Sequence, residues 1–359
     1  MGDSQTNKIE ISSSIVGSYK LEFIEDLITS FQKKIESDKY IFIIDDCLLD
    51  IYQKEFSIIK SHSRFISIQI NEENKTIDYS KNIIGKLLSL NVKKGDILVA
   101  IGGGITQDLV AFVSSILFRG MQWEFYPSTL LAQCDSCIGS KSSINYETYK
   151  NLIGTFLPPS NIYIYNGFLD SLLEKEIKSG IGEMCHYFLI NDDYLMYDLF
   201  DKYDTIFNER KSLIPFIKNS LTIKKRMIEI DEYDKNERHI FNYGHTFGHA
   251  IEAITSYSIP HGQAVTVGIN IANYISFKKN FLELKEFEKI YNALKANLPS
   301  FKLNETNIDN YLKALSKDKK NKKNLLGCIL KNKDGILEKY YLEFDVTLKN
   351  WLLDYSKTY

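Results

Sequence analysis

Short apolar segments alternate with amphipathic ones through the first third of the chain, and this alternation limits the possible folds most strongly. Residues 40–46 (YIFIIDD), 65–70 (FISIQI) and 97–101 (ILVAI) are apolar runs of strand length. The stretches between them, 47–60 and 74–93, carry apolar side chains at helical spacing. Buried strands joined by helices are typical of a parallel sheet covered on both faces. The sequence therefore predicts a doubly wound α/β domain, continued by a helix at 105–117 and a strand at 123–126.

The pattern changes after about residue 165, where strand signals remain only near 325–330 and 338–344. Pro158 and Pro159 favour a hinge within 158–170. We expect an α/β domain over residues 1–165 and a mostly helical domain over residues 166–359. The helices expected in the second domain are 168–192, 194–206, 211–230, 241–256, 262–279, 284–296 and 306–316.

Composition excludes several classes of protein. Lys plus Arg total 44 and Asp plus Glu total 46, so the net charge of −2 argues against nucleic-acid binding through bulk positive charge. Aromatic residues make up 13% of the chain, which excludes a disordered protein. No apolar run reaches about 18 residues, and the first residues do not resemble a secretory signal. The five cysteines are scattered and odd in number, so we expect a reduced, cytoplasmic protein.

A glycine-rich turn follows the apolar run at 97–101. Gly102, Gly103 and Gly104 separate this strand from the next expected helix. Such a turn lets the backbone approach a phosphate at a helix N-terminus, although it can equally be a tight strand–helix connection. Asp45 ends an earlier strand, where a carboxylate can accept hydrogen bonds from ribose hydroxyls or cap a helix. Each feature is compatible with a nucleotide site, and each leaves its structural alternative open.

Four of the six histidines fall between residues 239 and 261. His245 and His249 are four residues apart, so both would lie on one helical face, and Arg238 and Asn242 would continue that face. Such a face is too polar for a core, and imidazole is a common zinc ligand. The alternative is a pair of helix histidines that satisfy their hydrogen bonds without a metal.

Two further residues extend the candidate metal site. His261 follows Pro260 at the start of the next expected helix, and Glu183 lies within the apolar helix SGIGEMCHYFLI. A lone buried carboxylate is costly, and a metal ion would neutralise it. A buried ion pair or a bend that exposes Glu183 would also remove this cost.

A separate set of polar residues predicts an anionic substrate. Several of these side chains donate hydrogen bonds and occur shortly after the glycine-rich turn. Spacing alone does not bring them together, and scattered basic residues usually solvate a surface. The set comprises Arg119, Asp135, Lys141, Lys150 and Asn151.

Taken in order, the motifs resemble those of the 3-dehydroquinate synthase family of sugar phosphate cyclases, over about residues 40–345. Glu72 and Lys75 resemble the GExxK element of that family, with Asn71 in place of its glycine. The remaining matches are GGGITQD (102–108), FRG (118–120), PSTLLAQCDSCIGSKSSIN (127–145), KNLIGTF (150–156), SGIGE (179–183), NYGHTFGHAIE (242–252) and HGQAV (261–265).

The resemblance implies an N-terminal NAD-binding domain, a C-terminal metal-binding domain and an active site between them. It implies Zn²⁺, or Co²⁺ in its place, held by Glu183, His245 and His261, which makes His249 a substrate partner. The phosphate would be bound by Lys141, Asn151, Asn242, His249 and one lysine of the 317–323 run, taken as Lys319. NAD would contact Asp45, Glu72, Lys75, Gly102, Gly103, Gly104, Asp108, Ser128, Thr129 and Lys150.

The resemblance also implies the remaining partners of the substrate. Lys224 and Arg238 would bind its carboxylate, and Asp135 would hold ring hydroxyls. Arg119 would reach the phosphate in a neighbouring subunit, which predicts a homodimer.

Some positions depart from the family pattern. His186 stands where the family has a lysine that would contact a substrate hydroxyl. The histidine either takes over that contact or packs beneath the site. The dehydroquinate-forming members carry Gln-Pro where this chain has Pro158–Pro159, and Tyr165–Asn166 replace an Asp-Thr near the expected adenine side of NAD.

These observations favour a sugar phosphate cyclase that eliminates phosphate from a heptulosonate 7-phosphate and closes a carbocycle, as a 3-dehydroquinate synthase does. Arg238 favours a carboxylated substrate because its guanidinium fork suits a carboxylate. The alternatives are a cyclase of another sugar phosphate, of the 2-deoxy-scyllo-inosose or valiolone type, and a metal-dependent polyol dehydrogenase. A homologue that binds ligands without catalysis is a third alternative.

Overall fold

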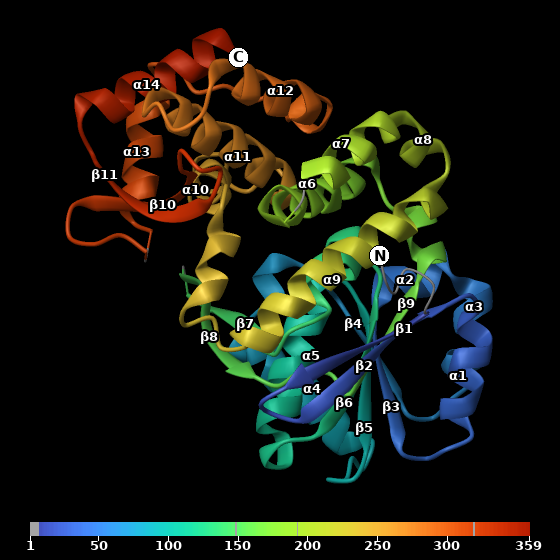
Figure 1. The fold of residues 1–359 in the computed structure, drawn as a ribbon. Helices are drawn as coiled ribbons and strands as arrows, with labels where there is room; N and C mark the ends of the chain where they lie inside the picture. The colour runs from blue at the N-terminus through green and yellow to red at the C-terminus, as the bar shows by residue number, and fades with distance from the viewer. Residues whose placement is uncertain (1–6, 148, 192, 319) are drawn as a thin grey trace. The chain divides into compact units, whose positions relative to one another are not determined.

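The chain forms two compact units, each with its own core (Figure 1). The first unit holds the residues up to Leu173 together with Arg210–Asp234, and the second holds Glu174–Glu209 and Lys235–Tyr359. The predicted boundary at residue 165 differs from this division in two ways. The first unit continues to Leu173, and it also includes Arg210–Asp234, which the sequence analysis placed in the helical domain. The computed structural model describes residues 7–147, 149–191, 193–318 and 320–359.

A seven-stranded sheet forms the centre of the first unit, in the order β1-β2-β9-β6-β5-β3-β4. All neighbouring strands pair in parallel except the β1–β2 hairpin at one edge. The strands are β1 (Lys8–Ser13), β2 (Gly17–Ile24), β3 (Tyr40–Asp45), β4 (Phe65–Ile68), β5 (Ile97–Gly102), β6 (Gln122–Pro127) and β9 (Asn161–Tyr165). The predicted parallel α/β sheet is confirmed.

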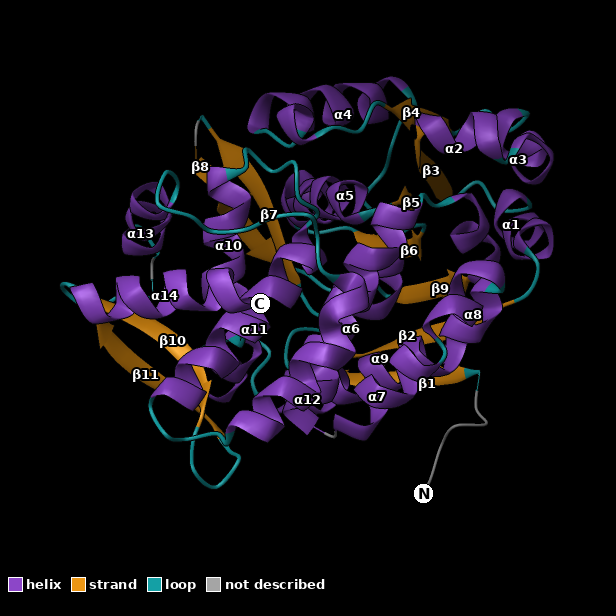
Figure 2. Cartoon of the chain, turned by 90° about the horizontal axis from the view of Figure 1, so that it is seen from above, coloured by secondary structure: helices purple, strands orange, loops and turns teal. Residues whose placement is uncertain are grey.

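Helices pack on both faces of this sheet (Figures 1 and 2). On one face, α1 and α3 bury Phe31 and Phe56 against Phe42 of β3, and Val99 and Ile101 of β5 join the same core. On the other face, α4 and α5 lie together. The helices of this unit are α1 (Leu27–Ile35), α2 (Asp46–Ile51), α3 (Gln53–Lys60), α4 (Ile77–Ser89), α5 (Gly104–Ile116) and α9 (Ile214–Ile230).

Two additions to the sheet carry polar residues of interest. A separate hairpin of β7 (Lys141–Tyr146) and β8 (Tyr149–Phe156) packs beside α5. Helix α9 packs against η3 (Ala132–Ser136), where the Ser220 hydroxyl donates to the carbonyl oxygen of Cys134 at 2.8 Å. This contact is one reason why α9 belongs to the first unit although helices of the second unit flank it in sequence.

The second unit is mostly helical, as predicted. Its one sheet among the described residues is the hairpin of β10 (Leu325–Lys331) and β11 (Leu337–Glu343). None of the described helices is both long and apolar enough to cross a membrane. Its helices are α6 (Glu174–Asn191), α7 (Asp193–Asp201), α8 (Tyr203–Asn208), α10 (His245–Ile254), α11 (His261–Lys278), α12 (Leu284–Leu294), α13 (Ile308–Ser316) and α14 (Val346–Thr358).

Glycines let three helices of the second unit approach very closely. A Cβ atom on Gly182 of α6 would lie 1.9 Å from the carbonyl oxygen of Gly262 on α11. A Cβ atom on Gly268 of α11 would lie 2.0 Å from the carbonyl oxygen of Gly244, just before α10. Both distances are far below van der Waals contact, so a larger residue would force these backbones apart.

We predict that Gly268→Ala lowers the free energy of unfolding by about 2 kcal/mol or more, because its methyl group overlaps backbone that cannot move easily. Chemical denaturation of the metal-free protein would measure the change. Gly85→Ala is the control, since a Cβ atom on Gly85 of α4 meets nothing within 4 Å. Alanine should stabilise that helix slightly. Equal stability of Gly268→Ala and the parent protein would contradict this packing.

Candidate functional site

The two predicted nucleotide-binding features lie at the carboxyl ends of adjacent strands. Asp45 ends β3 and Gly102 ends β5, and these strands pair in parallel. The chain passes from β3 outward to β4 and then returns to β5 on the other side of β3. Open α/β sheets commonly bind ligands at such a reversal of strand order. The Asp45 side chain also accepts a hydrogen bond from the Cys47 amide at 3.3 Å, so Asp45 caps the N-terminus of α2 as well.

The three glycines of the turn have different surroundings. A Cβ atom on Gly102 would lie 2.1 Å from Oγ1 of Thr106, so close packing within the turn requires glycine there. A Cβ atom on Gly103 would lie 3.0 Å from the methyl group of Thr129, and the Ser128 amide donates to the Gly102 carbonyl at 2.8 Å. Gly104, the first residue of α5, faces nearly open space, which leaves the helix N-terminus accessible to a phosphate.

A partly buried polar network joins three other predicted residues. Lys75 is 6% exposed, and its ammonium nitrogen lies 2.6 Å from an Asp108 oxygen and 2.7 Å from Oδ1 of Asn151. Burial raises the pKa of Asp108, and the charge of Lys75 opposes that change. Nearby, the Glu72 carboxylate pairs with Lys150 at 3.3 Å. These side chains bind one another, so the network also holds the β7–β8 hairpin against η1 (Glu72–Asn74) and α5.

Other predicted substrate residues of the first unit also form pairs. Lys224 on α9 is 4% exposed and lies 2.6 Å from an Asp135 carboxylate oxygen. Lys141, which begins β7, pairs with Asp234, a residue that the sequence analysis did not single out. Arg119 is exposed at the end of η2 (Leu117–Arg119), with φ of +64°. The structure therefore brings Lys224 and Asp135 together and leaves Arg119 apart from them on the surface.

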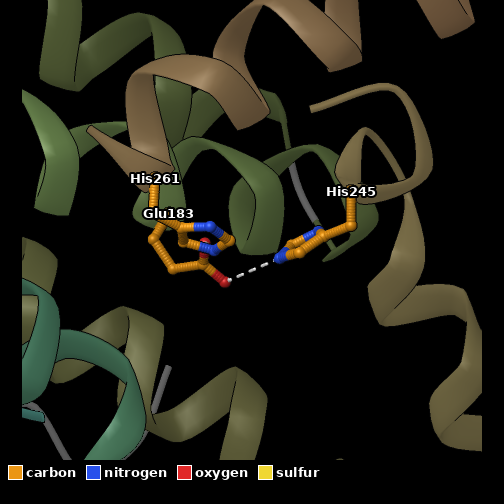
Figure 3. A group of neighbouring side chains, drawn as sticks. All are labelled: Glu183, His245 and His261. Carbon is orange, nitrogen blue, oxygen red and sulfur yellow. Dashed lines mark ion pairs between the residues drawn. The ribbon is translucent and has the colours of Figure 1, made fainter. Parts of the chain in front are cut away.

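Glu183, His245 and His261 converge in the second unit (Figure 3). They come from α6, α10 and α11, and one ligand atom of each lies within 4.8 Å of the other two. Nε2 of His245 lies 3.5 Å from one carboxylate oxygen of Glu183, and Nε2 of His261 lies 3.6 Å from the other.

This spacing fits a divalent metal ion. Both distances are too long for good hydrogen bonds. Two ligand atoms that each lie about 2.1 Å from one tetrahedral metal are about 3.4 Å apart. Glu183 is 3% exposed, and its Oε2 atom is buried with no hydrogen-bond partner. A carboxylate and two imidazoles with an open fourth position form a donor set that suits catalytic zinc.

The charges of the three groups are interdependent. Burial by itself raises the pKa of Glu183, but the neighbouring imidazoles, His245 above all, bring it well below the usual range. Burial lowers the pKa of His261, whereas the carboxylates of Glu183 and Glu252 raise it, and the net direction is upward. A metal ion that bound here would replace the proton of His261, so metal binding should weaken as the pH falls.

Sequence reasoning missed Glu252, whose Oε2 lies 3.2 Å from Nδ1 of His261. It is the last residue of the NYGHTFGHAIE motif and lies one helical turn after His249 on α10. His249, Glu252 and His261 form a second group whose ligand atoms also lie within 4.8 Å of one another. The signals in the sequence that could have found it were its place in this motif and its helical spacing from His249.

The expectation that Arg238 and Asn242 share a helical face with the histidines is wrong. Helix α10 begins at His245, and Arg238 and Asn242 belong to a separate 3₁₀ segment, η6 (Glu237–Asn242). Gly244 separates the two with φ of +78°, a conformation that few other residues adopt. The Asn242 side chain donates to the His239 carbonyl at 2.9 Å.

His186 is buried next to His245, one of the candidate metal ligands. It is 0% exposed, and its ring packs edge-on against His245, with ring centroids 4.7 Å apart, and against Tyr187 and Phe241. Burial and, next, the charge of His245 lower its pKa to about 3, so the ring is neutral near pH 7.

The lysine expected at the phosphate, Lys319, lies outside the described residues. Its neighbour Lys320 is described. Burial above all lowers the pKa of His249, and the charges of His245, His261 and Lys320 act in the same direction. The Lys320 ammonium lies 3.6 Å from an Asp318 carboxylate oxygen.

Comparison with known proteins agrees with these motifs. Residues 65–179 match the 3-dehydroquinate synthase N-terminal domain, and residues 180–321 match the 3-dehydroquinate synthase C-terminal domain. A 3-dehydroquinate synthase of Clostridium tetani is 35% identical over 318 residues, which cover 86% of this chain and 84% of the relative. One of Streptococcus equi is 30% identical over 357 residues, which cover 97% and 98% of the two chains.

Solved structures extend the comparison to the fold. A crystal structure of 2-deoxy-scyllo-inosose synthase complexed with carbaglucose-6-phosphate, NAD⁺ and Co²⁺ has a TM-score of 0.82 and 25% identity. The match covers 97% of this chain and 99% of that one. From the two domain matches and the relatives that match most of the chain we conclude that the chain belongs to the 3-dehydroquinate synthase family.

Proposed function

We propose that this protein is a sugar phosphate cyclase that converts a heptulosonate 7-phosphate to 3-dehydroquinate with loss of phosphate. The convergence of Glu183, His245 and His261 carries this proposal, because these residues come from distant parts of the chain and occupy the family motifs. Membership of the family gives the reaction class, and the donor set supplies a place for the metal ion.

We propose NAD and a divalent metal ion, Zn²⁺ or Co²⁺, as the cofactors. The solved relative that contains NAD⁺ and Co²⁺ supports both, and so do the reversal of strand order between β3 and β5 and the carboxylate–imidazole set. When bound, NAD would take a hydride from a substrate alcohol and return it, and the metal would polarise that oxygen as a Lewis acid. The protein itself would bind both cofactors and the substrate and fix their positions. Gly104 leaves room for a phosphate at the N-terminus of α5.

The basic residues would bind and orient the substrate. We assign Lys141, Asn151, Asn242, His249 and a lysine of the 317–323 run to the phosphate, and Lys224 and Arg238 to the carboxylate. Asp135 would hold ring hydroxyls, and its bond to Lys224 already fixes the orientation of both side chains. Holding the reacting ends of the substrate together favours the ring closure.

One alternative substrate class has specific support. His186 replaces a lysine that would contact a substrate hydroxyl in the family. Pro158–Pro159 replaces the Gln-Pro of the dehydroquinate-forming members and resembles the Pro-Pro of cyclases that act on other sugars. Arg238 opposes this alternative, since a neutral sugar phosphate offers no carboxylate to a guanidinium group. The burial of His186 also supports a packing role, in which case its identity says little about substrate hydroxyls.

We also propose that the enzyme is a cytoplasmic homodimer. The exposed position of Arg119 would let it reach a neighbouring subunit. The odd, scattered set of five cysteines suits a reducing compartment.

The function is tested by phosphate release from purified protein with NAD and each of three substrates: a heptulosonate, a sedoheptulose and a glucose phosphate. We expect turnover with the heptulosonate and no net NADH. Arg238→Met should reduce kcat/KM for the heptulosonate at least about 100-fold, because the carboxylate loses a charged bidentate partner. A preference for a neutral sugar phosphate would select the alternative cyclase, and net NADH without phosphate would select a polyol dehydrogenase.

Removing one proposed metal ligand should remove metal and activity together. We predict that His261→Ala binds less than about a tenth of the metal of the parent protein and releases no measurable phosphate. Elemental analysis after dialysis measures the first quantity. His239→Ala is the matched control, because His239 is an exposed histidine of η6. Full metal content in His261→Ala would reject the ligand assignment.

The pKa of His186 predicts a pH effect on stability. Its folded pKa of about 3 lies below the ordinary 6.5, so the unfolded chain binds more protons between these values. The contribution of this group to stability is therefore lost as the pH falls from 6.5 toward 3. We predict that His186→Leu loses about 2 kcal/mol less stability than the parent protein between pH 7 and pH 5. Urea unfolding with a chelator present would measure this, and parallel curves would indicate a solvated His186.

A further inference from the structure

His261 has a carboxylate on each side of its ring. Its Nε2 atom lies 3.6 Å from Glu183, and its Nδ1 atom lies 3.2 Å from Oε2 of Glu252. The contact to Glu252 is hydrogen-bonded, whereas the contact to Glu183 leaves space for an ion. The Glu252 side chain is only 13% exposed, so water competes weakly for this bond.

The two groups of potential metal ligands share His261. The inner group comprises Glu183, His245 and His261, and the outer group comprises His249, Glu252 and His261. A neutral imidazole has one nitrogen with a lone pair, and its other nitrogen carries hydrogen. His261 can therefore serve the inner group through Nε2 or the outer group through Nδ1, but a neutral ring does not serve both.

Glu252 decides between these uses of the ring. As an acceptor, its carboxylate favours a hydrogen on Nδ1 and so leaves the lone pair on Nε2, which faces Glu183. Metal-bound histidines commonly donate their second nitrogen to a carboxylate in this way, which fixes the tautomer and ring orientation. We propose that Glu252 is a positioning residue that directs the metal to the inner group and prevents binding at the outer one.

The backbone keeps Glu252 and His261 in register. Helix α10 ends shortly after Glu252, and Ser256 and Tyr257 turn the chain back with φ of 51° and 60°. The Tyr257 amide donates to the Glu252 carbonyl at 2.8 Å. A Cβ atom on Gly248 would lie 2.9 Å from the Ala264 carbonyl oxygen, so α10 and α11 are in direct backbone contact. The short distance between the two side chains thus follows from a tightly packed helix pair.

The inference rests on the metal site of the proposed function. Metal affinities of different variants test the metal site and the role of Glu252 separately. Chelator-stripped protein is titrated with Co²⁺ in competition with a chromogenic chelator. We expect Glu252→Ala to bind Co²⁺ about 10–100-fold more weakly than the parent protein. Glu252→Gln should bind more tightly than Glu252→Ala, because its amide oxygen can still accept the hydrogen bond from Nδ1.

Two histidine variants identify the group that holds the metal. If the metal binds to the inner group, His245→Ala should lower the Co²⁺ affinity more than Glu252→Ala does. His249→Ala should change the Co²⁺ affinity less than about threefold. Glu286→Ala is the control for removal of a carboxylate, because Glu286 pairs with Lys331 at 2.9 Å and is 47% exposed. The Co²⁺ absorption spectrum should change shape in Glu252→Ala and keep its shape in Glu286→Ala. A purely structural role for Glu252 would leave that shape unchanged.

Each other outcome overturns a different statement. Unchanged affinity in Glu252→Ala, or equal affinities in its alanine and glutamine variants, would refute the positioning role while the inner site stands. Loss of binding in His249→Ala and Glu252→Ala, with binding kept in His245→Ala, would make Glu252 a ligand of the outer group. Retention of binding in both His245→Ala and His261→Ala would reject the proposed metal site itself.

Discussion

The contact of Glu183 with two imidazoles is the interaction on which the rest of the second unit depends. A carboxylate that is 3% exposed is unfavourable unless cationic groups or a metal ion face it. Here His245 and His261 face its two oxygens from different helices. The cost of burying this charge therefore links α6, α10 and α11, and any loosening of one helix would leave a buried carboxylate without compensation.

The glycines of the second unit make this convergence sterically possible. Gly182 directly precedes Glu183, and Gly262 directly follows His261, and their backbones meet where α6 crosses α11. Side chains that point toward a shared ion need their helix axes close together, and a Cβ atom at either position would separate them. Gly182 and Gly262 thus set both the distance between the helices and the distance between the ligand atoms. This explains why the two glycines occur within the motifs SGIGE and HGQAV.

The sequence alone determined the elements whose signal is local. Apolar runs of strand length became β3, β4, β5 and β6, and the predicted helices at 262–279 and 284–296 became α11 and α12 within two residues. The order of the motifs also identified the family and the residues that meet as an inner ligand group. Such features depend on side-chain periodicity or on residues that are adjacent in the chain, and both can be read without a structure.

Only the tertiary structure decided which distant groups meet. Helix α9 looked like part of the helical domain, yet Ser220 and Lys224 bind η3 of the first unit. The strands β1 and β2 went unpredicted because their buried and exposed residues alternate, whereas the predicted strands were continuous apolar runs. Arg238 was expected beside the histidines, and a left-handed Gly244 separates them. Glu252 gained a role only through its contact with His261. Periodicity reports which face of an element is buried, whereas the partner on that face depends on packing between residues that the chain itself keeps far apart.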